Sequence, residues 1–225
     1  MGREAIRGKA GKRYGDRGVE KVSNHGIEDS TGRSYALDPL SLPSARSQGE
    51  PLTGKLNLPT GATIEYVVMA SEQQELLMAS DAGYGFICKF EDLIARNKAG
   101  KALISLPENA KVLKPKTLIN STALVVAITS AGRMLIFPAQ DLPVLSKGKG
   151  NKMITIPAAN AKDRSELLTK LLLISDQASL EFYSGKRKIV LKPEDLQKFR
   201  AERGRKGSTL PRGLHTNLEI MVVEP

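Results

Sequence analysis

The sequence predicts an all-β array of propeller-like blades, because a unit of about fifty residues occurs at least four times along the chain. Gly32, Gly83, Gly132 and Gly185 lie 51, 49 and 53 residues apart. Each closes a short turn, and a leucine follows ten or eleven residues later. A period near fifty that is built from short strands and turns is typical of propeller blades. Such arrays usually serve as binding surfaces and not as catalytic pockets.

The second repeat shows the order of elements within a blade. Apolar runs at 75–79 and 85–90 predict two strands, and the turn from Ser80 to Gly83 joins them. A connecting segment at 91–96 follows, and then a glycine turn and a strand within 98–107 that ends at a proline. Glycine after a short polar run is typical of a hairpin, because glycine adopts positive φ without a side-chain clash.

The third repeat has the same order, with strands expected at 124–128, 133–137 and within 147–157. The segment after it permits two interpretations. Leucines at 167, 168, 171 and 172 have helical spacing, which predicts a helix over 164–174. The corresponding place in the other repeats predicts a strand over 171–174, and we follow the repeats.

The first repeat is recognisable only from residue 30 onward. Segments 34–37, 42–46 and 54–59 correspond to those of the later repeats. Residues 21–28, where the inner strand is expected, lack a run of three or four apolar residues. Residues 1–20 contain five glycines and six basic residues with almost no apolar pattern. A flexible leader and the remnant of an earlier blade are both compatible with that composition.

These observations divide the chain into a leader and an array of about four to five four-stranded blades. Residues 1–28 form the poorly patterned leader or degenerate blade, and residues 29–225 form the array. The repeats are expected near 29–71, 72–121, 122–174 and 175–225.

The charge of the chain indicates a polyanionic partner. The formal net charge is +10 and the sequence pI is about 9.7. Residues 1–110 hold 14 Lys and Arg against 14 Asp and Glu, whereas residues 111–225 hold 20 against 10. Nucleic acid is the commonest cytosolic polyanion, so the excess favours a nucleic-acid partner. The alternative is a solvated basic face without a partner.

Composition also predicts the compartment. No run of eighteen apolar residues exists, and the N-terminus lacks a hydrophobic signal core, so we expect no membrane partner. The single Cys88 suits a reducing cytosol.

Nothing in the sequence predicts catalysis or a metal site. Only His25, His215 and Cys88 are present among the usual zinc ligands other than carboxylates, which does not supply a zinc cluster. The carboxylate pairs 91–92 and 194–195 occupy the same place in two repeats, which indicates a structural role. The glycine-rich segments 148–152 and 204–209 lack the Gly-x4-Gly-Lys-Ser/Thr spacing of a nucleotide loop.

Three basic, glycine-containing segments occupy equivalent positions in successive repeats: 96–101, 147–152 and 200–207. Glycine lets a backbone approach a phosphate, and neighbouring Lys or Arg neutralises it. Repetition at blade spacing would place these loops on one rim as a curved positive track. Such a track suits a bent duplex held through its phosphates. Single-stranded nucleic acid is less favoured, because aromatic residues that could stack on bases are scarce. The alternative is that these are solvated turn charges.

From about Asp29 to about Gly213 the chain resembles the C-terminal domain of the A subunit of bacterial DNA topoisomerase IV. The stretches that carry the resemblance include Asp29-Ser-Thr-Gly-Arg-Ser-Tyr-Ala36, Leu77-Met-Ala-Ser-Asp-Ala-Gly-Tyr-Gly-Phe86, Ala95-Arg-Asn-Lys-Ala-Gly-Lys-Ala-Leu103 and Leu145-Ser-Lys-Gly-Lys-Gly-Asn-Lys152. The seven-residue Gln-Arg-Arg-Gly-Gly-Lys-Gly box of the related gyrase protein is absent, which argues against gyrase-like wrapping of DNA.

The resemblance implies a β-pinwheel, a broken propeller whose blades exchange strands. It implies a domain that binds and bends duplex DNA and presents it for strand passage, with cleavage and metal chemistry in other parts of the enzyme. The implied partners are duplex DNA, the N-terminal cleavage core of the same polypeptide, and the ATPase-bearing B subunit in a heterotetramer. The implied setting is the cytoplasm, at the nucleoid. No cofactor is expected in this domain, and ATP and Mg²⁺ belong to the whole enzyme.

Charge and repeat position together nominate residues for phosphate binding. These are Arg33, Arg46, Lys89, Arg96, Lys98, Lys101, Arg133, Lys147, Lys149, Lys152, Lys186, Arg187, Lys188, Arg203, Arg205 and Lys206. The competing hypothesis is a protein-interaction propeller that docks on the topoisomerase core or on an acidic partner.

Overall fold

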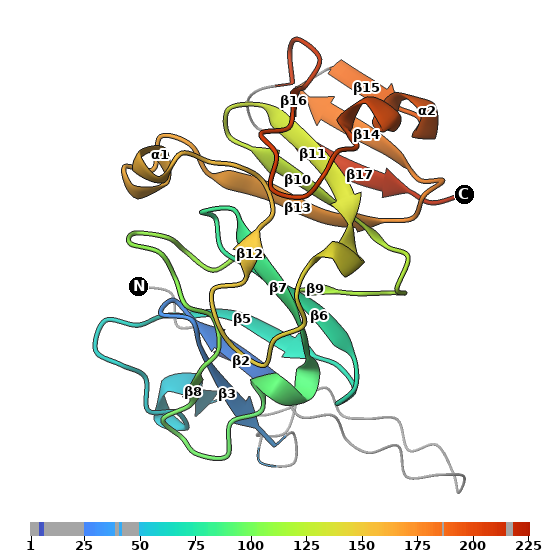
Figure 1. Ribbon diagram of the computed structural model, residues 1–225. Coiled ribbons are helices and arrows are strands. Elements are labelled where there is room, and N and C mark those ends of the chain that lie inside the picture. The colour runs from blue at the N-terminus through green and yellow to red at the C-terminus, as the bar shows by residue number, and fades with distance from the viewer. Residues whose placement is uncertain (1–4, 7–24, 39–40, 42–49, 186, 215–217) are drawn as a thin grey trace, which may run out of the picture. The chain divides into compact units, whose positions relative to one another are not determined.

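The computed structural model describes residues 5–6, 25–38, 41, 50–185, 187–214 and 218–225 (Figure 1). The chain divides into two compact units. Unit 1 consists of residues 1–74 and 89–103, and unit 2 consists of residues 75–88 and 104–225. Of the nominated residues, Arg46 and Lys186 lie outside the described residues, as does His215.

Unit 1 contains one four-stranded antiparallel sheet, in the order β5-β2-β3-β8. Its strands are β5 (Ile64–Met69), β2 (His25–Asp29), β3 (Arg33–Leu37) and β8 (Lys101–Ala102). A short pair, β1 (Ala5–Ile6) with β4 (Glu50–Pro51), accompanies the sheet, together with the 3-10 turns η2 (Leu52–Gly54) and η3 (Phe90–Leu93). Ile27, Tyr35, Leu37, Leu52 and Leu56 form a buried apolar cluster within this unit.

Two four-stranded sheets of unit 2 repeat that order. The first contains β9 (Lys116–Thr117), β6 (Glu75–Ala79), β7 (Tyr84–Lys89) and β12 (Asn151–Lys152). The second contains β13 (Leu168–Ile174), β10 (Leu124–Thr129), β11 (Arg133–Pro138) and β16 (Ser208–Thr209). The β10 strand is buried along its whole length, as expected for an aliphatic run that forms the inside of a blade.

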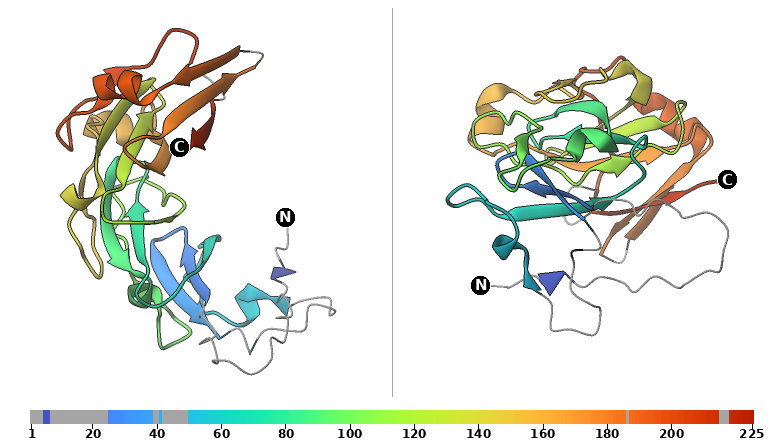
Figure 2. Two further views of the ribbon diagram at one scale, coloured as in Figure 1. Left: turned by 90° about the vertical axis from the view of Figure 1, so that its right-hand side faces the viewer. Right: turned by 90° about the horizontal axis from the view of Figure 1, so that it is seen from below.

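A further sheet of unit 2 has three strands among the described residues. They are β15 (Arg187–Leu191), β14 (Ser179–Ser184) and β17 (Glu219–Val223), in that order, and Figure 2 shows them in orange and red. Short helical elements connect the sheets of this unit: η4 (Ala139–Asp141), α1 (Ala158–Lys162), α2 (Pro193–Leu196) and η5 (Gln197–Phe199).

The outer strand of each four-stranded sheet comes from the following repeat. β8 pairs with β3, β12 pairs with β7, and β16 pairs with β11, each over two residues. The donating residues lie 66 to 76 positions after the residues that they pair with. This exchange of strands confirms the expected pinwheel. We call β8, β12 and β16 the donated strands.

The apolar residues on the two faces of the β10–β11 hairpin belong to different clusters. Val125, Ala127 and Leu135 pack in a cluster with Leu77 and Ile87. The alternate positions of the same strands pack with the β14 strand, in a second cluster that includes Leu180 and Phe182. Period-two alternation therefore buries both faces of a middle blade, and the strand reads as a continuous apolar run.

The first strand of the array corrects the boundary between the array and residues 1–28, which were assigned to a poorly patterned leader or degenerate blade. Residues 25–28 belong to β2, which is a central strand of the first sheet. Its pattern was obscured because it contains Gly26 and the buried carboxyl of Glu28. A side chain at position 26 would lie 2.9 Å from the ring of Phe90, so close packing explains the glycine.

The segment after the third repeat contains a strand, as the repeats predicted. The strand β13 is longer than expected and begins at Leu168, while a short helix that the pattern did not predict, α1, lies at Ala158–Lys162. The strands expected within 98–107 and 147–157 are present as β8 and β12, and each pairs over only two residues. At each donated strand the chain pairs with the edge of the preceding sheet and then continues into the sheet of its own repeat.

Candidate nucleic-acid interface

The three basic segments precede or contain the donated strands, and a glycine with positive φ introduces each strand. These glycines are Gly100, Gly150 and Gly207, with φ values of 65°, 75° and 77°. A Cβ atom at any of these positions would lie within 2.7 Å of a backbone carbonyl oxygen of the accepting sheet. The glycines are therefore required by the close approach of two protein backbones. The sequence had instead suggested that these glycines let the backbone approach a DNA phosphate.

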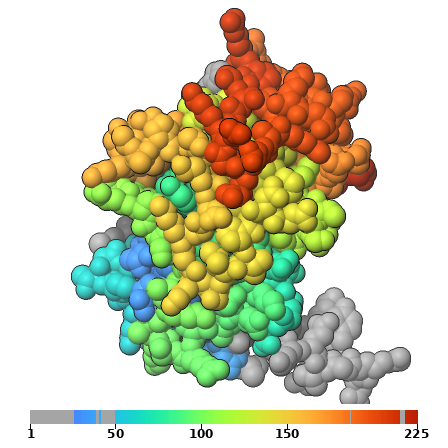
Figure 3. Space-filling model, viewed as in Figure 1, coloured from blue at the N-terminus to red at the C-terminus, as the bar shows by residue number. Residues whose placement is uncertain are grey.

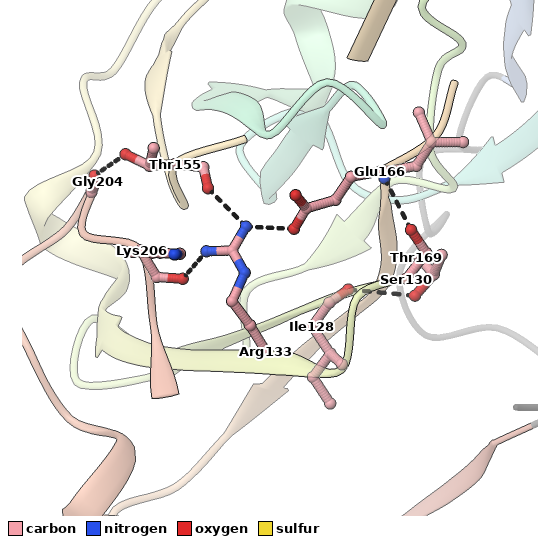
Figure 4. Close-up of polar contacts among 9 residues, drawn as sticks. Ile128, Ser130, Arg133, Thr155, Glu166, Thr169, Gly204 and Lys206 are labelled. Carbon is pink, nitrogen blue, oxygen red and sulfur yellow. Dashed lines mark hydrogen bonds and ion pairs between the residues drawn. The ribbon is translucent and has the colours of Figure 1, made fainter. Parts of the chain in front are cut away.

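Two of the basic segments lie side by side in unit 2. The amide of Thr155 donates to the carbonyl of Arg205 (2.9 Å), and the amide of Gly204 donates to the carbonyl of Met153 (2.8 Å). The Thr155 hydroxyl also donates to the carbonyl of Gly204 (2.5 Å), as Figure 4 shows. On the face seen in Figure 3, the yellow surface of the first segment meets the red surface of the second. The expected proximity of neighbouring basic loops is thus present within this unit.

The bond between Thr155 and Arg205 has counterparts at the other basic segments. The amide of Asn57 donates to the carbonyl of Lys98 within unit 1 (2.8 Å). The amide of Ser105 donates to the carbonyl of Gly148 within unit 2 (2.9 Å). In each case the chain leaving one basic or glycine-containing segment is tied to the next such segment by a backbone bond.

Most of the nominated side chains on these loops reach solvent. The exposed ones are Arg96, Lys98, Lys147, Lys149, Arg205 and Lys206, while Lys101, Lys152 and Arg203 are partly exposed. Within the described part of the chain, Arg96, Lys98, Lys147 and Lys206 form no ion pair with an acidic side chain. These four cations are available to a polyanion without breaking an ion pair among the described residues.

Other nominated cations already have partners. Arg203 donates to the carbonyls of Lys152 (2.6 Å) and Asp141 (3.0 Å), and Arg205 pairs with Glu202 (2.9 Å). Lys89 lies 3.6 Å from Glu91 on the surface of unit 1. Such exposed pairs are weak, so they do not by themselves exclude phosphate binding.

Lys188 and Arg187 lie on β15, away from the three basic segments in sequence. The Lys188 ammonium is 2.8 Å from Glu181, and this hydrogen bond, together with that to Tyr183, raises the pKa of Lys188. The same contact lowers the pKa of Glu181, so the pair stays charged. Arg187 is exposed.

Arg133 has a different place from the one that its charge suggested. Its side chain is 9% exposed and forms an ion pair with Glu166, which is equally buried. The guanidinium also donates to the carbonyls of Lys206 and Thr155, the latter at 3.1 Å (Figure 4). Because its donors are used within the protein, we remove Arg133 from the phosphate-binding set.

Arg33, at the equivalent position of the first sheet, also bonds to backbone. Its guanidinium donates to the carbonyl of Ala99 (2.9 and 3.2 Å) and to that of Gly100 (3.0 Å). Sequence reasoning could not distinguish these two arginines from surface cations. The available signal was their position directly after a turn glycine, where the side chain faces the donated strand.

The carboxylate pairs have the structural role that their repetition indicated. Asp92 accepts a hydrogen bond from the amide of Lys89 (3.0 Å), and Asp195 accepts one from the amide of Lys192 (3.3 Å). Both therefore cap a short helical turn. Cys88 is buried, and no group of three or more potential metal ligands occurs in the described parts of the chain. No helix among the described residues is long and apolar enough to cross a membrane.

Comparison with known proteins identifies the family. Residues 74–117 and 123–175 match the family described as the DNA gyrase C-terminal domain, beta-propeller. The A subunit of DNA topoisomerase 4 from Escherichia coli K12 is 61% identical over 197 residues, which are 88% of this chain and 26% of that protein. Its counterpart from Pseudomonas aeruginosa is 48% identical over 198 residues, again 88% and 26%. The chain thus spans about a quarter of the length of the curated relatives that it matches.

Solved structures agree with these relatives. The E. coli ParC C-terminal domain aligns with a TM-score of 0.86 and 55% identity, covering 90% of this chain and 82% of that one. The DNA gyrase A C-terminal domain aligns with a TM-score of 0.61 at 16% identity, covering 90% of this chain and 67% of that one, and shows a shared fold.

Proposed function

The chain belongs to the family of C-terminal domains found in the A subunit of topoisomerase IV, and we propose that it binds duplex DNA through the phosphates along its basic loops. The relatives carry the name of a topoisomerase, an enzyme class that acts on DNA. The observation that carries the proposal is the pair of basic loops tied side by side in unit 2, with Lys147 and Lys206 exposed. The two loops of unit 2, held side by side, can follow the phosphate backbone of a duplex without reading its sequence.

The proposed phosphate-binding set contains the nominated cations of the three loops that are exposed or partly exposed. These residues are Arg96, Lys98, Lys101, Lys147, Lys149, Lys152, Arg203, Arg205 and Lys206. Lys89, Arg187 and Lys188 are kept as secondary candidates, because they lie on other segments.

A salt titration of duplex binding tests this function. For a phosphate-dominated complex, log affinity falls linearly with log salt, with a slope of about −0.9 for each phosphate neutralised. We expect Lys147→Ala and Lys206→Ala each to reduce the magnitude of that slope by about 0.9. Lys198→Ala is a matched control, because Lys198 is an exposed lysine of η5 outside the loops and should leave the slope nearly unchanged.

No duplex binding at low salt would contradict the proposal. In that case the favoured function would be the second candidate, a protein-interaction array that docks on the topoisomerase core or on an acidic partner. The basic excess of residues 111–225 is the observation that favours such a partner.

We further propose that the domain bends the bound duplex and presents it to the cleavage core of the same polypeptide, for ATP-dependent strand passage with the B subunit at the nucleoid. The domain itself needs no cofactor for this role, and ATP and Mg²⁺ would serve the rest of the enzyme. Energy transfer between dyes at the two ends of a short duplex tests bending. An end-to-end distance that stays unchanged at saturation would contradict it.

A further inference from the structure

We propose that Arg33, Tyr84 and Arg133 are positioning residues that hold the basic loops in place for DNA, and that they do not contact phosphates themselves. This inference rests on the proposed function. Each of the three directly follows a turn glycine, namely Gly32, Gly83 and Gly132. We call these three residues the anchors.

The anchors share one position in the sheets. Arg33 is paired with Ala102, Tyr84 with Lys152, and Arg133 with Thr209, so each anchor opposes the second residue of a donated strand. Because the register is the same, each side chain starts from the same point of its sheet and reaches the loop that precedes the donated strand.

Two of the anchors bind loop backbone. Arg33 donates to the carbonyls of Ala99 and Gly100, directly between Lys98 and Lys101. Arg133 donates to the carbonyl of Lys206. A guanidinium presents several donors in a rigid fork, so it can fix a turn that has few hydrogen bonds of its own.

The third anchor acts on a basic side chain directly. The Lys149 ammonium lies 4.0 Å from the centroid of the Tyr84 ring, as in a cation–π contact. Tyr84 therefore replaces a backbone bond by an attraction to the loop cation itself. The contacts of all three anchors have the same consequence, which is a loop that is ordered before DNA arrives.

Ordering matters because binding must otherwise immobilise long side chains and a glycine-containing loop. That loss of freedom weakens association, and preorganisation reduces it. An anchor thus affects DNA affinity without touching DNA. A phosphate contact would instead add to the number of counterions released.

Tyr84 gives the sharpest test, because its substitution leaves the net charge unchanged. We expect Tyr84→Leu to weaken duplex binding by about two- to fivefold, the range of an exposed cation–π contact. Tyr84→Phe retains the ring face and should restore the affinity of the unaltered chain. The loss should disappear when Tyr84→Leu is made in a Lys149→Ala background, because the partner cation is gone.

An equal loss in both backgrounds, or no loss in either, would overturn the role of Tyr84. The thermal midpoint of each variant checks that the fold is retained. If Tyr84→Leu lowers it strongly, Tyr84→Met, which keeps a large apolar side chain but has no ring, replaces it in the same comparison with and without Lys149→Ala.

Substitutions of Arg33 distinguish an anchor role from a direct phosphate contact. Arg33→Lys keeps the charge but loses the fork, so an anchor role predicts a two- to fivefold loss of affinity and faster amide exchange at Gly100 and Leu103 without DNA. If Arg33 contacts a phosphate, Arg33→Lys should bind duplex DNA like the unaltered chain and leave amide exchange unchanged. Arg33→Gln should then reduce the magnitude of the salt slope by about 0.9. That second result would overturn the anchor proposal.

The proposed function and this inference fail differently. Absence of duplex binding by the unaltered chain contradicts the function. The exchange rates, which are measured without DNA, still decide whether the anchors order the loops. Exchange that is unchanged in both Arg33→Lys and Arg133→Lys would overturn the anchors whatever the DNA result.

Discussion

The first sheet, β5-β2-β3-β8, and the third, β13-β10-β11-β16, have the same strand order but different chemistry at equivalent positions. Glu28 is paired with Ser34 in the first sheet, where Ile128 is paired with Met134 in the third. Ile128 and Met134 belong to a large apolar cluster. The carboxyl oxygens of Glu28 and the hydroxyl of Ser34 are buried without a hydrogen-bond partner among the described residues.

The arginine anchors of the two sheets also differ, but here it is the third sheet that buries the polar group. Arg133 is buried with Glu166, whereas Arg33 is partly exposed and bonds to carbonyls, with no acidic partner for its guanidinium in the part of the chain that the structure describes. The same backbone register is thus supported by an apolar face and a buried ion pair in the third sheet. In the first sheet the register tolerates buried polar groups, and the arginine at the equivalent position is only partly buried. The comparison teaches that the pinwheel repeats its backbone geometry, while the source of stability varies from blade to blade.

The largest expected effect is removal of the buried arginine. Arg133→Ala leaves the Glu166 carboxylate buried without its partner, which should lower the free energy of unfolding by about 3–5 kcal/mol. Arg33→Ala is the matched variant of the first sheet and should lose only about 1 kcal/mol, because its bonds to backbone carbonyls lie at a partly exposed site and leave no charged group buried. Urea denaturation of both variants measures the difference. Equal losses would show that the two anchors support their sheets alike.

A smaller effect is expected from Glu28, and it depends on pH. Burial, followed by the neighbouring charges of Asp29 and Glu65, raises the pKa of Glu28 to about 8. The folded state therefore holds a proton that the unfolded state releases above its ordinary pKa of 4.5. The raised pKa of Glu28 therefore makes its full contribution to folded-state stability below pH 4.5, and this contribution is lost as the pH rises toward 8. Glu28→Gln should flatten this dependence and raise the free energy of unfolding at pH 7 by about 3 kcal/mol.

Denaturation between pH 4.5 and 8 checks the Glu28 prediction. Glu65→Gln, a change at an exposed carboxyl of the same sheet, is the control and should leave most of the pH dependence in place. A Glu28→Gln variant with the same pH dependence as the unaltered chain would contradict the assignment.

The smallest effect is expected from the glycines that precede the donated strands, because the first and third sheets have the same backbone geometry there. Gly100→Ala and Gly207→Ala each place a Cβ atom within 2.7 Å of a carbonyl oxygen at positive φ, so both should lose about 2 kcal/mol. Gly61→Ala has the same strained backbone but open space around it and should lose about 1 kcal/mol. Thermal denaturation compares the three. A loss in only one sheet would mean that the donated strands are not held equally closely.

Much of the fold was predictable from local patterns. The turn glycines and the strands near 75–79, 124–128 and 133–137 lie where the repeat predicted them. The strand β2 was missed because Gly26 and Glu28 interrupt its apolar pattern, and both are explained only by packing. The repeat identified the three basic segments as equivalent. Their positive-φ glycines, however, allow two protein backbones to approach closely and are not explained by a phosphate.

The candidate site was predictable only in part. Charge and repeat position selected Lys147 and Lys206, which are exposed on adjacent loops. The same criteria selected Arg133, which is buried in an ion pair with a glutamate thirty-three residues away. Net charge does not reveal which cations are used inside the protein, because that depends on partners distant in sequence.

The sequence by itself determined the repeat period, the hairpins and the basic composition of the loops, because these arise from neighbouring residues. The tertiary structure alone decided which sheet accepts each donated strand and which arginine becomes an anchor. Arg33 meets its carbonyl partner 66 residues away, and Arg133 meets its own 73 residues away. Contacts of that separation form only when neighbouring repeats exchange strands, so no local pattern records them.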